Sequence, residues 1–407
     1  MKPTVDLINP FSRELYVMAK PVGAACNLAC DYCYYLEKSR TLPHQGPRTL
    51  MSDAVLEQYV SQYMAAQTHP EVCFTWHGGE AMLRSIEWYK RVMELQRRYA
   101  QGRQVLNCLQ TNGTLLDDRW CRFLRDNGWL VGVSIDGPAD FHNEYRRTPA
   151  DRPTFETVMR GIRLLQRHGV EWNAMAVVND YNADYPREFY RFFKEIGCRY
   201  IQFTPIVERR RPDGTLCAPC DTDGELTPMS VTPQQWGDFL CGVFDEWVRE
   251  DVGRIFVQIF DATLACRVGQ TPGVCSMAET CGHAAMMEHN GDLYSCDHFA
   301  FPQYRLGNIM ERGIAEMMSS ERQLRFGEAK RDNLPLSCRS CRWLKQCHGE
   351  CPKNRFAVDP ADGTRRLNYL CEGYKKYFAH VEPYMAFMEA ELAAGRPPAN
   401  VMSIHNS

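Results

Sequence analysis

The chain has 407 residues, of which 44% are hydrophobic and 24% are charged, and its formal net charge is −3. This composition is typical of a folded protein with one large domain and a smaller one, and the charge gives no electrostatic reason to expect nucleic acid or an anionic membrane as a partner. The N-terminal stretch lacks the apolar core of a secretory signal, and no apolar run is long enough for a transmembrane helix. We therefore expect a cytoplasmic protein.

Residues 14–207 alternate between short apolar runs and segments with helical periodicity. The apolar runs are typical of buried strands and lie at residues 15–22, 72–80, 107–113, 130–137, 172–179 and 200–207. Between them, apolar residues recur every three or four positions, and several segments begin with a Ser, Thr or Asp that can cap a helix. This alternation predicts an α/β fold with a parallel sheet, either doubly wound or curled into a barrel.

Unusual residues follow the first four of these runs. Three cysteines come after the first run, and the next three end in "HGGE" (77–80), "QTNGT" (110–114) and "SIDGP" (134–138). Each motif alone predicts only a turn. Because the carboxyl ends of parallel strands meet at one edge of a sheet, the four together predict a shared site.

The remainder of the chain contains an insertion, a helix and a cysteine-rich region. Residues 208–230 are rich in Pro, Gly and Asp, so we expect a surface loop there, although its C-x-x-C (Cys217, Cys220) is also a metal-ligand spacing. A long amphipathic helix is expected next, and the last thirty or so residues read as a helix and a tail. Between them, eight clustered cysteines make two complete four-thiolate sites, which suit either zinc or iron–sulfur clusters.

The N-terminal cysteine cluster has only three thiols, one fewer than a four-thiolate site needs. They belong to Cys26, Cys30 and Cys33. A structural zinc site and a fully ligated cubane both need four ligands. Three thiolates therefore indicate either a partial zinc site or a cluster with one open iron, and an open position is what a catalytic metal centre needs.

The motif C-x3-C-x2-C after the first strand of a β/α repeat resembles the radical S-adenosylmethionine (SAM) superfamily. The resemblance implies a partial (β/α)6 barrel and a [4Fe-4S] cluster on the three cysteines, with SAM as the fourth ligand. It also implies SAM contacts at Tyr32, Gly79, Glu80, Ser134, Arg146 and Val207.

The C-terminal cysteines are similar in spacing to the SPASM extension, which carries two auxiliary [4Fe-4S] clusters. The resemblance assigns Cys275, Cys281, Cys296 and Cys351 to auxiliary cluster I. It assigns Cys338, Cys341, Cys347 and Cys371 to auxiliary cluster II. The expected domains are then a barrel (1–230), a connecting helical segment (231–274), a SPASM domain (275–375) and a C-terminal helix and tail (376–407).

Among SPASM proteins, the segments "KPVGAACNLACDYCYYLEK", "FTWHGGE", "LQTNGTLL" and "GECPKNRF" are most similar to anaerobic sulfatase-maturating enzymes. This implies oxidation of a Cys or Ser in an unfolded sulfatase chain, within a C/S-x-P/A-x-R motif, to Cα-formylglycine. It also implies a flavodoxin or ferredoxin as electron donor. The resemblance makes Asp297 the general base, with Asp261 as the alternative, and Tyr35 and His77 are candidate substrate contacts.

Two other functions are compatible with parts of the sequence. A SPASM enzyme that makes thioether or carbon–carbon crosslinks in peptides shares the cluster motifs, and a non-catalytic metal-binding scaffold shares the C-terminal cysteines. The scaffold does not account for the open three-thiol motif beside "GGE". The identity of the client sulfatase and its preference for Cys or Ser are not determined by these motifs.

Overall fold

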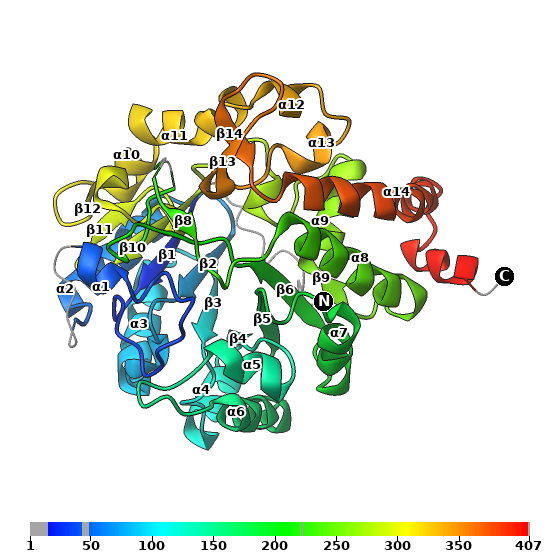
Figure 1. Ribbon diagram of the computed structural model, residues 1–407. Helices are drawn as coiled ribbons and strands as arrows, with labels where there is room; N and C mark the ends of the chain where they lie inside the picture. The colour runs from blue at the N-terminus through cyan, green and yellow to red at the C-terminus, as the bar shows by residue number, and fades with distance from the viewer. Residues whose placement is uncertain (1–14, 43–48, 220, 222, 406–407) are drawn as a thin grey trace. The chain divides into compact units, whose positions relative to one another are not determined.

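The computed structural model describes residues 15–42, 49–219, 221 and 223–405, which form two compact units. The first contains residues up to 134, 145–172 and 281–329; the second contains 135–144, 173–280 and the chain from 330 onward. Figure 1 colours the chain by residue number. Within the described ranges, no helix is long and apolar enough to cross a membrane.

The first unit is built on a mainly parallel sheet. In spatial order its strands are β12 (Arg305–Asn308), β11 (Asp292–Tyr294), β10 (Ala284–Glu288), β1 (Tyr16–Lys20), β2 (Glu71–Trp76), β3 (Gln104–Thr111) and β4 (Leu130–Ser134). Strands β10, β1, β2, β3 and β4 run parallel, whereas β11 and β12 form an antiparallel edge. The sheet is open and does not close into a barrel.

Three helices of this unit begin where the sequence supplies a capping side chain. Helices α2 (Asp53–Ala65), α3 (Ile86–Tyr99) and α4 (Asp118–Asp126) each have an N-cap oxygen that accepts a backbone N–H, from Ser52, Ser85 and Asp117 respectively. Helices α1 (Lys38–Thr41), α6 (Phe155–His168) and α10 (Ile314–Met318) complete the set, and α11 (Glu321–Asp332) runs from this unit to the start of the second. The predicted β/α alternation is confirmed here.

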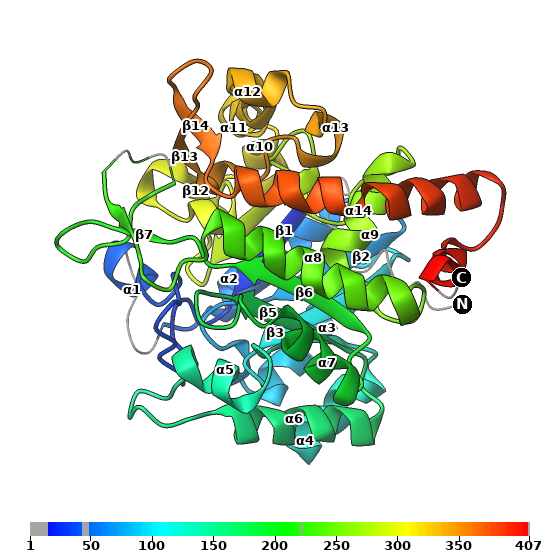
Figure 2. The same ribbon diagram turned by 45° about the vertical axis from the view of Figure 1, so that its right-hand side comes forward.

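The second unit continues the alternation and adds the C-terminal cysteines. Strands β5 (Trp172–Val178), β6 (Tyr200–Pro205) and β9 (Phe256–Val257) pair in parallel. Its helices are α5 (Ala139–Tyr145), α7 (Pro186–Glu195), α8 (Pro233–Glu250), α9 (Gln258–Arg267), α12 (Leu336–Arg339), α13 (Leu344–Cys347) and α14 (Cys371–Ala393). Helices α8 and α14 lie side by side in both views (Figures 1 and 2), with Trp236 and Tyr374 in edge-to-face contact at 6.1 Å.

Two short hairpins complete the second unit. Strands β13 (Arg355–Val358) and β14 (Arg365–Asn368) form one, between the cysteines of the C-terminal array. Strands β7 (Arg209–Arg210) and β8 (Glu225–Leu226) form the other, within the insertion for which we expected a surface loop. There, Cys217 is buried and Arg211 forms ion pairs with Asp221 and Asp223, so these carboxylates already have a protein cation.

Strand β10 is the feature that the sequence pattern did not indicate. It lies within the cysteine-rich region but pairs with β1 along its whole length, from Tyr16–Ala284 to Lys20–Glu288. Residues 281–329 therefore belong to the first compact unit, together with the strand that precedes the three cysteines. The SPASM domain expected from residue 275 stays a prediction, and its boundary differs from the boundaries of these compact units.

Candidate active site and cluster-binding residues

Cys26, Cys30 and Cys33 lie on the loop after β1, and none of them forms a disulfide. The loop is fixed by backbone hydrogen bonds to a distant segment, from Ala29 N to Arg147 O at 2.8 Å and from Asp31 N to Tyr145 O at 3.1 Å. Burial, together with the neighbouring Glu80, Cys33 and Cys30, raises the pKa of Cys26 to about 12. Desolvated thiols close together need a cation before they can ionise, and a bound metal cluster would supply one.

The "GGE" segment after β2 is hydrogen-bonded to this cysteine loop. Gly79 N donates to Gly23 O and Glu80 N donates to Ala25 O, both at 2.8 Å. A Cβ atom on Gly79 would lie 2.0 Å from Ala25 O, so only glycine permits this approach. The two glycines therefore bring the end of β2 against the residues that precede Cys26.

Glu80 is buried and its carboxylate is already partly hydrogen-bonded. Oε1 accepts from Met82 N at 2.9 Å and from Thr111 Oγ1 at 2.8 Å, and Oε2 accepts from Asn112 N at 2.8 Å. Burial raises the pKa of this carboxyl, while the bonds from Asn112, Met82 and Thr111 oppose the rise. Glu80 thus joins the ends of β2 and β3 next to Cys26, and its contact with SAM stays a prediction.

The "QTNGT" loop contributes side chains to which the sequence analysis assigned no role. Asn112 Nδ2 donates to Asn27 Oδ1 at 2.9 Å and lies 3.8 Å from the Cys26 sulfur. Asn27 Nδ2 in turn donates to Thr114 Oγ1 at 2.8 Å. The sequence feature that could have indicated this role is the position of the loop at the end of β3, the strand next to the one that "GGE" follows. A buried amide beside Cys26 orients the ligand loop without adding charge.

Three of the four other residues predicted to contact SAM lie in the first unit. The Ser134 hydroxyl accepts from Gln110 Nε2 at 3.0 Å. The Arg146 guanidinium lies 5.4 Å from the centre of the Tyr32 ring. Burial raises the pKa of Cys33, and the charges of Arg146 and Lys20 oppose that rise. Val207 is buried in the second unit. The SAM contacts of these four residues stay predictions.

Asp297, the predicted base, forms an ion pair with a lysine that is completely buried. Lys20 Nζ lies 2.8 Å from Asp297 Oδ1, off the direction of a hydrogen bond, and Oδ2 accepts from the Tyr34 hydroxyl. Burial alone would raise the pKa of Asp297, but the positive charge of Lys20 holds it well below its usual range. Lys20 ends β1 and Asp297 follows β11, and both strands pair with β10, so this long-range pairing brings the two segments into one sheet.

The two candidate substrate contacts surround the same lysine. His77 Nδ1 accepts from Gly78 N at 2.7 Å and lies 3.3 Å from Lys20 Nζ. Burial, with the charge of Lys20, lowers the pKa of His77 to about 3, which keeps the imidazole neutral. Tyr35 is buried with its hydroxyl donating to Glu288, and Lys20 Nζ lies 4.4 Å from its ring centre. The geometry gives both residues a supporting position, and their substrate contacts stay predictions.

Asp261, the alternative base, lies on α9 in the second unit. Burial raises the pKa of this carboxyl to about 7. Unlike Asp297, it has no ion pair within the described part of the chain. Asp261 therefore has the protonation behaviour of a general base but lacks the buried lysine that holds Asp297.

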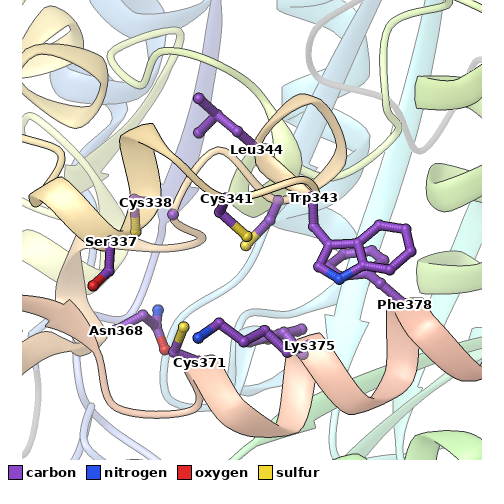
Figure 3. Close-up of a pocket in the computed structure, with 12 residues that line it drawn as sticks. Ser337, Cys338, Cys341, Trp343, Leu344, Asn368, Cys371, Lys375 and Phe378 are labelled. Carbon is purple, nitrogen blue, oxygen red and sulfur yellow. The ribbon is translucent and has the colours of Figure 1, made fainter.

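The four cysteines assigned to auxiliary cluster II line one small cavity in the second unit. Figure 3 shows Cys338, Cys341 and Cys371 around this cavity, and Cys347 also lines it. Burial raises the pKa of Cys371 to about 12, while Lys375 opposes the rise. Trp343 and Phe378 stack at 5.9 Å beside the thiols. Four thiols around one cavity fit a fully ligated cluster.

The cysteines assigned to auxiliary cluster I are divided between the two compact units. Cys281 and Cys296 belong to the first unit, whereas Cys275 and Cys351 belong to the second. Burial, together with Glu350 and Cys275, raises the pKa of Cys351 to about 12. Cys275 and Cys351 are therefore neighbours, and the assignment of all four residues to one cluster stays a prediction.

Comparison with known proteins identifies the family. The Radical SAM superfamily model matches residues 21–193, and SPASM, an iron-sulfur cluster-binding domain, matches residues 275–342. The chain is 59% identical to the serine-type anaerobic sulfatase-maturating enzyme of Bacteroides thetaiotaomicron, over 97% of this chain and 95% of that protein. The chain belongs to the anaerobic sulfatase-maturating enzymes. SAM and iron–sulfur clusters are accordingly its cofactors, as expected.

More distant members of the family agree. The chain is 32% identical to the cysteine-type anaerobic sulfatase-maturating enzyme of Clostridium perfringens, over 91% of this chain and 96% of that protein. The solved structure of native anSMEcpe with bound AdoMet and Cp18Cys peptide has a TM-score of 0.81 at 30% identity, and the match covers 93% of this chain and 99% of that one. The expected radical SAM and SPASM fold is confirmed.

Proposed function

We propose that this sulfatase-maturating enzyme oxidises the active-site serine of an unfolded sulfatase chain to Cα-formylglycine, and that cysteine is accepted in the same position. The 59% identity to a serine-type enzyme supports the choice of serine. The observation that carries the chemistry is the position of Asp297. Its carboxylate is paired with Lys20, the last residue of the strand that leads into the three-cysteine loop.

The reaction removes two hydrogen nuclei and two electrons from the substrate side chain. Cys26, Cys30 and Cys33 would hold the cluster that, together with SAM, would supply the radical chemistry for removing one hydrogen atom from Cβ. The hydroxyl proton goes to the carboxylate of Asp297. The C-terminal cysteines would hold auxiliary clusters able to take up the remaining electron, and the side chain that results is the aldehyde. With a cysteine substrate the product is a thioaldehyde, which water hydrolyses.

The chain's own residues have separate tasks in this proposal. Glu80 and Asn112 hold the Cys26 loop against the ends of β2 and β3. Lys20 and Tyr34 hold Asp297 in its ionised form, so it can accept a proton without first losing one. His77 is neutral and adds no positive charge where the substrate loses its proton.

The test is a direct comparison of two short peptides that differ only in Ser or Cys within the C/S-x-P/A-x-R motif. Each is incubated under anaerobic conditions with the reconstituted enzyme, SAM and dithionite, and the products are examined by mass spectrometry. The serine peptide should lose two hydrogens, and the cysteine peptide should also exchange sulfur for oxygen. Crosslinked product with intact side-chain oxygen or sulfur would instead identify a peptide crosslinking enzyme.

The physiological reductant that we expect is a flavodoxin or ferredoxin, in the cytoplasm. Replacing dithionite by one of these carriers should support formylglycine formation. If neither supports turnover while dithionite does, this partner assignment is wrong and the peptide chemistry is unaffected.

A further inference from the structure

Lys330 is a buried lysine whose charge is compensated by backbone carbonyls. It lies on α11 with only 1% of its surface exposed. Its ammonium donates to Cys275 O at 2.9 Å, to Ser276 O at 2.6 Å and to Ala278 O. Three hydrogen bonds use all the donors of an ammonium group. Lys330 therefore fastens the short helical turn that begins at Cys275.

No carboxylate forms an ion pair with Lys330 among the residues that the structure describes. This distinguishes it from Lys375 near the other four cysteines, which is partly exposed and pairs with Glu372 at 2.8 Å. Burying a cation without a counterion is unfavourable even when its hydrogen bonds are satisfied. Carbonyl dipoles reduce that cost but leave the full positive charge in place. A buried cation that has hydrogen bonds but no counterion is suited to a neighbouring group that carries negative charge.

The second loop in this region is fastened by Arg355. Its guanidinium donates to the carbonyls of His348, Gly349 and Glu350, at 2.7, 2.9 and 3.1 Å, and to Lys330 O at 2.6 Å. His348, Gly349 and Glu350 all have positive φ angles, between 47° and 68°, and two of them are not glycine. Such a run is strained at the two non-glycine residues. The guanidinium stabilises the turn that directly precedes Cys351.

The two fastened loops carry Cys275 and Cys351, which lie near each other. Burial raises the pKa of Cys351, Cys275 raises it further, and the charge of Lys330 acts in the opposite direction. Lys330 thus lies within electrostatic range of these thiols. At the cysteines assigned to auxiliary cluster II, the positive charges that lower the thiol pKa values are those of Arg355 and Lys375 at Cys338, and that of Lys375 at Cys371.

We propose that Lys330 is a positioning residue for auxiliary cluster I, which fastens the Cys275 loop and makes the cluster a better electron acceptor through its permanent positive charge. The proposal rests on the assignment of Cys275 and Cys351 to this cluster. A cluster held by these thiolates would gain one negative charge on accepting an electron, at a site that already carries the negative charge of its ligands. A nearby cation stabilises the reduced form more than the oxidised form, and so raises the reduction potential.

The test measures reduction potentials and needs no sulfatase substrate. Lys330→Gln and Lys330→Arg are made in the full-length chain, in a background where Cys26, Cys30 and Cys33 are alanine so that only auxiliary clusters remain. Lys345→Gln removes an exposed lysine of the same region and is the matched control. Iron per chain and redox titrations followed by electron paramagnetic resonance are recorded for each variant.

We expect Lys330→Gln to make one auxiliary cluster harder to reduce, by about tenfold in equilibrium constant, or about 59 mV for a one-electron couple. Lys330→Arg and Lys345→Gln should match the parent. If Lys330→Gln loses iron, recovery of both iron and potential in Lys330→Arg supports the proposal, whereas iron loss in both variants contradicts the role of charge. Unchanged iron and potentials in Lys330→Gln would overturn the proposal. Because no peptide is used, failure here is distinct from failure of the proposed function.

Discussion

The two groups of cysteines are held by different kinds of interaction. Around Cys26, the support comes from backbone amides, the Asn112 amide and a buried carboxylate, Glu80, whose charge opposes thiolate formation. Around Cys275 and Cys351, the support comes from two cations that bind backbone carbonyls. The first arrangement suits a site completed by a cosubstrate with its own ammonium group. The second suits clusters completed by protein thiolates alone, which carry excess negative charge.

The difference also separates two tasks. An open three-thiol site binds the cosubstrate and starts the reaction, whereas a closed four-thiol site has no position for substrate and is limited to electron transfer or structure. Substitutions at the three-thiol site should therefore affect SAM cleavage, whereas substitutions at the four-thiol sites should affect electron transfer or stability.

The largest effect should come from removing the three-thiol site. Replacing Cys26, Cys30 and Cys33 together by alanine should abolish SAM cleavage and lower the iron content from about twelve to about eight per chain, as four-iron clusters require. Iron analysis and assay of 5′-deoxyadenosine measure both quantities. Replacing Cys338 and Cys371 by alanine is the matched control, and it should spare SAM cleavage. Zinc in the C-terminal sites would contradict their role as electron acceptors.

The next effect concerns Asp297→Asn, which should separate the two products of the reaction. Without a base, formylglycine should fall by about 10²–10⁴-fold, while 5′-deoxyadenosine still forms. The structure adds a complication, since Lys20 is completely buried and loses its partner, which can destabilise the fold by about 3–5 kcal/mol.

A double variant resolves that complication. Lys20→Met combined with Asp297→Asn removes both charges. Compared with Asp297→Asn alone, the double variant should have a higher thermal unfolding temperature, while its formylglycine formation should stay low. Asp261→Asn is the comparison for the alternative base, and it should leave the product ratio unchanged. Near wild-type formylglycine formation by Asp297→Asn would exclude Asp297 as the base and make Asp261 the next residue to examine.

Much of the fold was predictable because it depends on local patterns. Strand and helix periods and capping side chains are short-range features, and the β/α alternation agrees with them. The cavity lined by Cys338, Cys341, Cys347 and Cys371 groups the four cysteines that the family resemblance assigned together, and their binding of one cluster stays a prediction. The pairing of β10 with β1 was not predictable, because nothing local in "AAMME" specifies its partner strand. The ion pair between Lys20 and Asp297 joins two segments that lie in one sheet only because of that long-range pairing.

The roles of Lys330, Arg355 and Asn112 were missed for a related reason. A lysine in a polar helical segment resembles any surface lysine, and only the tertiary structure shows that it is buried against three carbonyls. Gly79 was assigned to SAM binding by family resemblance, while the structure shows a separate steric reason for glycine in its approach to Ala25 O.

A smaller effect is expected from Glu80→Gln, which tests the support of the three-thiol site. The amide keeps the shape of the side chain but removes its charge and turns one acceptor into a donor that faces protein N–H and O–H groups. We expect SAM to bind about tenfold more weakly, which is about 1.4 kcal/mol, while the cluster iron is retained. Calorimetric titration with SAM measures the affinity. Unchanged affinity would contradict the predicted contact between Glu80 and SAM.

The smallest effect concerns His77 and the pH dependence of stability. Its pKa is lowered to about 3 in the folded protein, chiefly by burial and then by Lys20, whereas the unfolded chain has the ordinary value near 6.5. Below about pH 6.5 the unfolded state therefore binds a proton at this position that the folded state does not bind, so His77 makes the protein less stable as the pH falls.

His77→Gln removes this contribution, at most about 1.4 kcal/mol per pH unit. Unfolding by urea at pH 7 and pH 5.5 should show a smaller loss of stability on acidification for the variant than for the wild type. His168→Gln, at a partly exposed histidine that pairs with Asp118, is the control and should not reduce that loss. An equal loss in wild type and His77→Gln would mean that the folded protein binds a proton at this imidazole as readily as the unfolded chain does, and would contradict the lowered pKa of His77.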